Sequence, residues 1–176
     1  MTPEQYLSDL RTTGWFDGLP PEAERDVEEN VRTALAAGRA PEPWPEPAWF
    51  DCESIFAEGD YTALLDTFVA ASYGTFAPTS VREEWDDEAG ETVVQFGFDL
   101  NGRRFERTLR GEDEWVSPDF FDLIAQAMES QGLGLVFCDV ETGDQTALFF
   151  LCNARAFVRA DDAGLIPTLE APDEDE

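Results

Sequence analysis

Apolar residues recur at helical spacing in five segments of the chain, and each segment carries residues that commonly begin or end a helix. With their flanking caps, the predicted helices cover residues 2–13, 20–37, 61–73, 117–132 and 153–162. Thr2 with Gln5, Asp60, Ser117 and Asn153 are the predicted N-caps. Glycines at positions 14, 38, 74 and 132 follow the apolar stripes and are expected to end the first four helices.

Apolar runs bounded by turn residues predict five strands, over residues 81–86, 92–100, 103–110, 135–140 and 145–152. Asn101-Gly102 is typical of a two-residue type I′ hairpin turn, and this turn predicts the register of the strands around it. The expected pairs are Phe98 with Phe105 and Val94 with Leu109 on one face, and Asp99 with Arg104 on the other. Arg107 then lies beside Phe96 on the apolar face, where an arginine needs a carboxylate partner or an edge position.

Residues 148–151, Leu-Phe-Phe-Leu, are apolar at both alternating positions, which predicts a central strand covered on both faces. Strands joined by tight turns indicate an α+β fold: a mainly antiparallel sheet of about five strands packed by helices, with an N-terminal helix pair. We predict a helical segment over 1–38, a proline-rich connector over 39–49, an α+β domain over 50–168 and an acidic tail over 169–176.

The connector has proline at four alternate positions, 41, 43, 45 and 47, which favours an extended conformation. Trp44 and Trp49 in this segment indicate that it lies on the body of the protein.

Charge narrows the range of functions. The chain has 39 acidic residues against 11 basic ones, a net charge of −28, and it contains no histidine or lysine. Catalytic triads, Schiff bases and phosphate-binding loops with a lysine are therefore excluded. Paired carboxylates could still serve catalysis. With so many acidic residues, however, close carboxylate pairs arise by chance and do not indicate an active site. We therefore expect no enzyme and no cofactor.

Such a surface repels nucleic acids and anionic membranes and attracts basic proteins. Over the roughly 8,600 Å² of surface expected for this mass, the negative charge is about threefold less dense than on B-DNA. A nucleic-acid mimic that inhibits DNA-binding proteins would therefore need its acids on one face. A further alternative is a non-catalytic accessory domain, whose acidity reflects a salt-adapted or high-GC organism.

The three cysteines are widely spaced, which indicates buried free thiols in a reducing cytosol. The chain shows no signal peptide and no membrane-spanning run, so a cytoplasmic location is expected. The acidic segments 86–91 and 139–144 lack the spacing of an EF-hand, and turns explain them better than a metal site.

Two acidic runs next to tryptophans are the candidate partner-binding site. Because the third strand of the predicted meander returns to the end where the first turn lies, the runs should share one edge of the sheet. The candidate residues are Glu83, Glu84, Trp85, Asp86, Asp87, Glu88, Glu112, Asp113, Glu114 and Trp115. The alternative is a solvated turn whose acids neutralise the arginines at positions 103, 104, 107 and 110.

The stretches FDLNGRRF, EDEWVSPDFFDLIAQAMESQG and TGDQTALFFL resemble immunity proteins of bacterial polymorphic-toxin systems, over about residues 60–166. Those are small, often acidic α+β proteins that bind and block a cognate toxin, commonly a nuclease. The resemblance implies an inhibitor of a basic toxin and assigns no individual binding residue.

Overall fold

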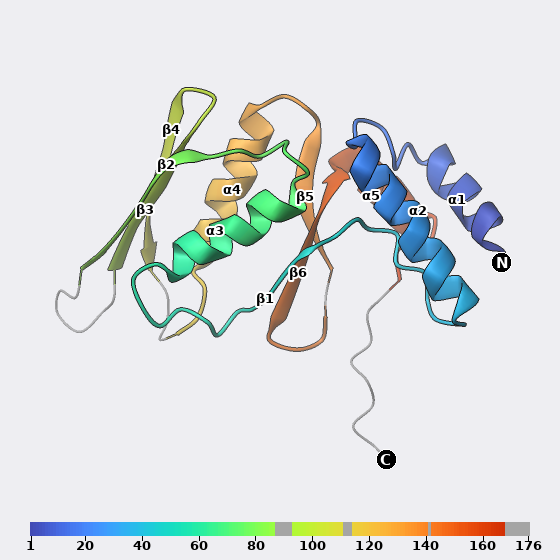
Figure 1. The fold of residues 1–176 in the computed structure, drawn as a ribbon, viewed down its shortest axis with the longest axis horizontal. Helices are drawn as coiled ribbons and strands as arrows, with labels where there is room; N and C mark the ends of the chain where they lie inside the picture. The colour runs from blue at the N-terminus through green and yellow to red at the C-terminus, as the bar shows by residue number, and fades with distance from the viewer. Residues whose placement is uncertain (87–92, 111–113, 141, 168–176) are drawn as a thin grey trace, which may run out of the picture.

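The computed structural model describes residues 1–86, 93–110, 114–140 and 142–167, which form four layers in the order sheet, helices, sheet, helices (Figure 1). The helices of this part of the chain are α1 (Pro3–Thr12), α2 (Pro21–Ala36), α3 (Asp60–Ala71), α4 (Pro118–Ser130) and α5 (Ala154–Asp162). Its strands are β1 (Ala48–Asp51), β2 (Thr79–Asp86), β3 (Val93–Leu100), β4 (Arg103–Arg110), β5 (Leu135–Val140) and β6 (Thr146–Asn153). The predicted acidic tail, 169–176, lies outside the described residues.

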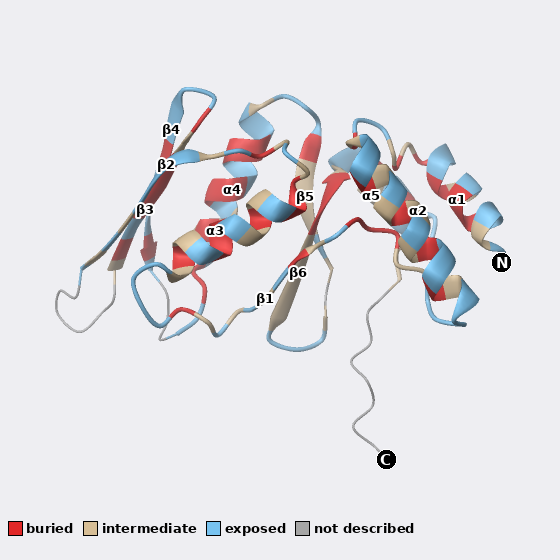
Figure 2. Cartoon of the chain, viewed as in Figure 1, coloured by how far each residue is buried: buried red, intermediate tan, exposed pale blue. Residues whose placement is uncertain are grey.

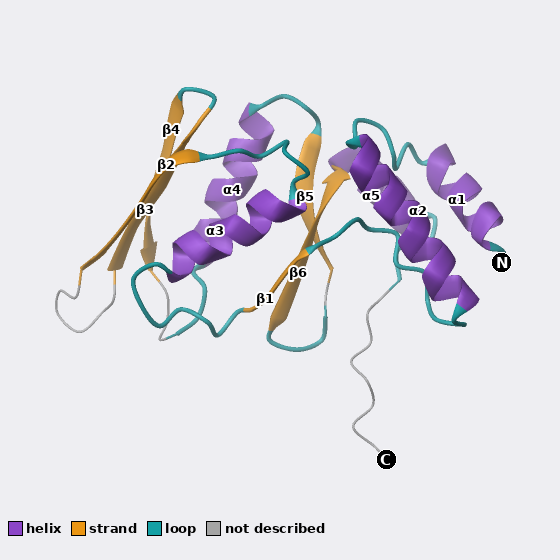
Figure 3. Ribbon diagram, in the orientation of Figure 1, coloured by secondary structure: helices purple, strands orange, loops and turns teal. Residues whose placement is uncertain are grey.

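The expected α+β fold with antiparallel strands is confirmed, but its strands do not form one sheet. The six strands of the described residues form two antiparallel three-stranded sheets, in the orders β2-β3-β4 and β1-β6-β5. Helices α3 and α4 lie between the two sheets, and α1, α2 and α5 cover the outer face of the second (Figure 3). The sequence pattern missed β1, which begins at the end of the proline-rich segment and pairs with β6.

The hairpin register is confirmed. Asn101 and Gly102 both adopt positive φ, 52° and 77°, as a type I′ turn requires. The observed pairs are Phe98 with Phe105, Val94 with Leu109, Asp99 with Arg104 and Phe96 with Arg107. The expected ion pair is present, with Arg104 Nη1 3.4 Å from Asp99 Oδ1.

Arg107 meets both conditions expected for an arginine on the apolar face. It lies on β4, an edge strand of its sheet, and its Nη1 is 2.9 Å from Asp119 Oδ1 and 3.6 Å from Asp122 Oδ2. Both carboxylates come from α4, so this ion-pair cluster links the first sheet to the helical layer.

β6 is the central strand of its sheet and is covered on both faces, as predicted. Phe149 packs against the core around α3 and α4, whereas Phe150 belongs to the core beneath α1, α2 and α5. The two cores therefore share this sheet as their common wall, and the helices on both sides of it carry buried residues (Figure 2).

The proline-rich segment is attached to the N-terminal helices by hydrogen bonds. Trp15 Nε1 donates to the carbonyl oxygen of Pro43 (2.7 Å), and Asn30 Nδ2 donates to that of Trp44 (2.9 Å). Trp44 is buried as expected, with 4% of its surface exposed. Trp49 is not, since 67% of its surface is exposed.

The predicted caps are confirmed in part. Thr2 accepts a hydrogen bond from the backbone N–H of Gln5, and Asn153 accepts two from the first turn of α5. Asp60 is the first residue of α3 rather than its cap, and it accepts hydrogen bonds from the N–H groups of the preceding loop. Ser117 stands at the N-cap of α4, but its buried hydroxyl has no partner in the described structure.

The cysteine expectation is also wrong for two of the three residues. Cys138 on β5 and Cys152 on β6 form a disulfide within the hairpin, and Cys52 remains a free thiol. The bridge lies on the face of the sheet covered by α1, α2 and α5.

Candidate functional site: an acidic and aromatic edge

Six of the ten candidate residues fall within the described structure. Asp87, Glu88, Glu112 and Asp113 lie outside it. The ends of β2, β3 and β4 that flank the two acidic runs do lie together, since Val93 pairs with both Asp86 and Arg110. The meander therefore brings Asp86, in the first run, and Arg110, which precedes the second run, to one end of the first sheet.

The alternation of β2 divides the first acidic run between two faces of the sheet. Glu84 and Asp86 are exposed, and Glu84 forms an ion pair with Arg82 at 2.6 Å. Glu83 and Trp85 are only partly exposed, and Trp85 packs against the core around α3 and α4. Trp85 is thus an internal packing residue more than a surface anchor.

Glu83 is used inside the fold. Its carboxylate accepts hydrogen bonds from the backbone N–H of Gly59 (2.9 Å) and from both the backbone N–H (2.9 Å) and the hydroxyl (2.7 Å) of Thr62. It also accepts one from Trp85 Nε1 (2.7 Å). Because these backbone groups belong to the first turn of α3, Glu83 closes that helix end from a neighbouring strand.

The loop between β1 and α3 joins the second acidic run to this end of the molecule. Trp115 forms a β-bridge with Glu53, and the N–H of Ile55 donates to the carbonyl oxygen of Glu114 at 2.9 Å. The N–H of Val116 donates to the carbonyl oxygen of Cys52 at 2.8 Å. These contacts hold residues 114–116 against the same loop that contacts Glu83 through Gly59.

The result is a surface that we call the acidic–aromatic edge. Its members are exposed, and they lie at the end of β2, in the loop before α3 and in the segment before α4. These segments meet at one end of the first sheet, near the start of α3 (Figure 1). They are Glu53, Phe56, Glu58, Asp86, Glu114 and Trp115. The two aromatic side chains are 62% exposed for Phe56 and 42% exposed for Trp115.

Its carboxylates have no ion-pair partner among the described residues. Two nearby arginines expected to neutralise the acidic runs are engaged elsewhere: Arg104 with Asp99 and Glu106, and Arg107 with the acids of α4. The Arg103 guanidinium lies over the ring of Phe105, 4.8 Å from its centroid. The edge therefore combines carboxylates that lack an ion-pair partner among the described residues with exposed aromatic surface.

Cys52 precedes the edge residue Glu53 in the chain and is a free thiol. Burial, with Asp51 and Asp144 nearby, raises the pKa of the Cys52 thiol, which keeps it protonated and weakly nucleophilic. Within the described residues, no group of three or more cysteine and carboxylate side chains could hold a metal ion.

In the acidic segment 139–144, the Asp144 carboxylate accepts hydrogen bonds from the turn in which it lies. Asp144 Oδ1 accepts hydrogen bonds from the Thr146 hydroxyl (2.5 Å), the Thr146 N–H (2.8 Å) and the Thr142 hydroxyl (3.0 Å). These hydrogen bonds, led by the one from the Thr146 hydroxyl, lower the pKa of Asp144. Segment 86–91 lies mostly outside the described residues.

Sequence reasoning missed Glu53, Phe56 and Glu58. The loop that carries them has no periodic pattern, and it joins Trp115 through pairing across about sixty residues of chain. A phenylalanine in a segment rich in polar and small residues is the local signal that the sequence offers here.

No helix in the described part of the chain is both long and apolar enough to cross a bilayer. Comparisons with known proteins find no family model, no curated protein and no solved structure that matches this chain.

Proposed function

We propose that this chain is an acidic binding protein that inhibits a basic partner protein, in the manner of an immunity protein that neutralises a toxin. The observation that carries the proposal is the exposure of Phe56 and Trp115 among carboxylates without ion-pair partners in the described structure. Aromatic anchors surrounded by polar groups are typical of protein interfaces. The net charge of −28 makes a basic surface the complementary partner.

Inhibition follows from the chemistry of such a partner. An enzyme that acts on nucleic acid binds phosphates through arginine and lysine side chains in its substrate groove. An edge that covers this groove with carboxylates and buries its two aromatic side chains there would exclude the substrate. Charge complementarity mainly accelerates association, so the complex should form fast at low salt and more slowly as salt is added.

The experiment is a binding measurement with the product of the reading frame next to this gene, using cytochrome c as an unrelated basic protein. We expect the double variant Phe56→Ala/Trp115→Ala to weaken binding by at least about thirtyfold, equivalent to roughly 2 kcal/mol at interface hot spots. Leu133→Ala is the matched control, because Leu133 is also exposed (52%) but lies outside the edge.

Three results would contradict the proposal. One is an absence of association at low salt, and another is equal affinity for cytochrome c. The third is a loss of affinity in the Leu133 variant as large as in the double variant, because the edge would then have no special role.

A further inference from the structure

A hollow of about 360 Å³ lies on the outer face of the β2-β3-β4 sheet, away from α3 and α4. Its floor is Gly97 on the central strand β3, and its walls are polar side chains from all three strands. Ligand pockets begin near this volume but are usually apolar, so this hollow suits a small polar molecule. None of its lining residues belongs to the acidic–aromatic edge, and the inference does not depend on the proposed function.

Gly97 makes room for an arginine. A Cβ atom at this position would lie 2.7 Å from the carbonyl oxygen of Phe105 and 3.0 Å from Arg104 Nη2. The guanidinium group of Arg104 therefore occupies the space of a side chain at position 97. It is held there by Nη1, which donates to the carbonyl oxygen of Ser80 at 2.9 Å.

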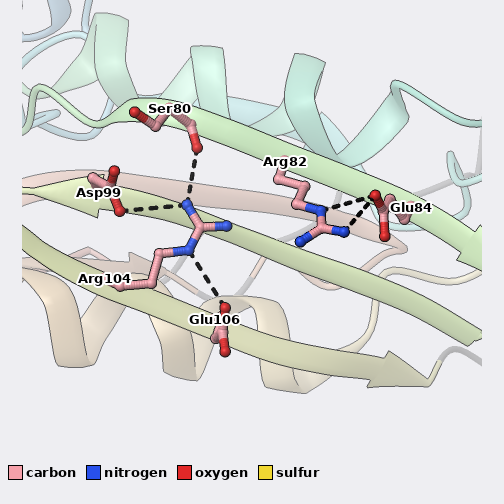
Figure 4. Close-up of polar contacts among 6 residues, drawn as sticks. All are labelled: Ser80, Arg82, Glu84, Asp99, Arg104 and Glu106. Carbon is pink, nitrogen blue, oxygen red and sulfur yellow. Dashed lines mark hydrogen bonds and ion pairs between the residues drawn. The ribbon is translucent and has the colours of Figure 1, made fainter.

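A second guanidinium reaches over the same strand from the opposite side. Arg82 donates from Nε and Nη2 to one oxygen of Glu84, at 2.8 and 2.6 Å. The remaining nitrogens, Nη1 of Arg82 and Nη2 of Arg104, have no acceptor among the described residues, and they face one another across β3 (Figure 4). Since like charges repel, an anionic group between them would be stabilised.

The hollow has a third donor and two acceptors. Gln95 accepts a hydrogen bond from the Thr108 hydroxyl through Oε1 (2.9 Å), which leaves its amide nitrogen without a partner in the described structure. Arg82 uses only Oε1 of Glu84, and Arg104 contacts only Oε2 of Glu106. One oxygen of each glutamate is therefore open to a cationic group.

The charges around the hollow favour a ligand that has no net charge. The two arginines face three carboxylates, those of Glu84, Asp99 and Glu106, in a protein of net charge −28. A phosphate dianion would be repelled by this surrounding charge. A molecule with no net charge avoids the repulsion and still forms charge-assisted hydrogen bonds at both ends.

We propose that the hollow binds a small zwitterion of the α-amino-acid type. Its carboxylate lies between the facing nitrogens of Arg82 and Arg104, above Gly97. Its ammonium group contacts the open oxygen of one of the two glutamates, Glu84 or Glu106.

The test is an NMR titration of the isotope-labelled full chain at low ionic strength, with glycine, acetate and inorganic phosphate as separate probes. Glycine should shift the amide signals of Gln95, Gly97 and Thr108 saturably, and bind about tenfold more tightly than either anion. The variant Arg82→Gln should weaken glycine binding about tenfold. Arg25→Gln is the matched control, because Arg25 is an exposed arginine on α2.

Arg82 is well exposed (63%), so its replacement is expected to leave the fold intact, which circular dichroism verifies. The proposal would be overturned by acetate or phosphate binding as tightly as glycine, or by the absence of saturable shifts with all three probes. Equal weakening by Arg82→Gln and Arg25→Gln would also overturn it, since binding would then reflect overall charge.

Discussion

The Glu83 carboxylate on β2 accepts hydrogen bonds from both the backbone N–H and the hydroxyl of Thr62, in the first turn of α3. An acidic residue from one layer thus supplies the cap that α3 lacks in its own sequence, where Gly59 stands at the N-cap. This contact joins the first sheet to the helical layer beside the acidic–aromatic edge.

Replacing Glu83 by alanine should therefore destabilise the protein by about 2 kcal/mol, because the part-buried N–H group of Thr62 and the exposed one of Gly59 lose their charged acceptor. Urea unfolding followed by tryptophan fluorescence measures this change. Glu84→Ala is the matched control, since its ion pair with Arg82 is exposed and should contribute at most about 1 kcal/mol. Equal effects of the two variants would show that the Glu83 hydrogen bonds do not stabilise α3.

The stability of the fold should fall in alkaline solution. Burial raises the pKa of all three tyrosines, Tyr6, Tyr61 and Tyr73, and a hydrogen bond from the Tyr73 hydroxyl to Asp26 adds to the effect. A tyrosine with a raised pKa stays protonated in the folded protein while the unfolded chain loses its proton above about pH 10. Stability is then complete below that pH and is lost as the pH rises towards the folded-state pKa.

The expected slope is up to about 1.4 kcal/mol per pH unit for each tyrosine. The chain has no lysine to titrate in the same range, so urea unfolding between about pH 9 and 11.5 reports on the tyrosines and on the Cys52 thiol, whose pKa is also raised. Tyr73→Phe should reduce the slope. A free energy of unfolding that stays constant over this range would contradict the prediction.

The Cys138–Cys152 disulfide should be detectable by peptide mapping of the purified protein under non-reducing conditions. With a sequence separation of 14 residues, its reduction should lower the free energy of unfolding by about 3 kcal/mol on a loop-entropy estimate. Cys52→Ser is the control and should leave this difference unchanged. Two free thiols at positions 138 and 152 in the purified protein would contradict the prediction.

Replacing Gly97 by alanine should lower the free energy of unfolding by about 1–3 kcal/mol. The added methyl group meets the Phe105 carbonyl oxygen and displaces the Arg104 guanidinium. Thermal unfolding measures the effect. Replacing the nearby exposed Thr108 by alanine is the control, and it removes only the hydrogen bond to Gln95. A neutral Gly97→Ala variant would show that the strand can shift to accept a side chain.

Most helices, the β3–β4 register and the central position of β6 follow from the sequence alone. The positive φ angles at Asn101-Gly102 depend on two adjacent residues, and a two-residue turn leaves one register for its strands. The alternation of Phe149 and Phe150 likewise needs only the period of a strand to predict cover on both sides.

Only the tertiary structure decided how these elements combine. The pairing of β1 with β6, the bridge between Glu53 and Trp115 and the Cys138–Cys152 disulfide all join positions that no local pattern relates. The insertion of α3 and α4 between the strands divided one expected sheet into two. The same packing turned Glu83 and Trp85 inward and left Phe56 and Trp115 exposed, since partners distant in sequence determine which face of an element is covered.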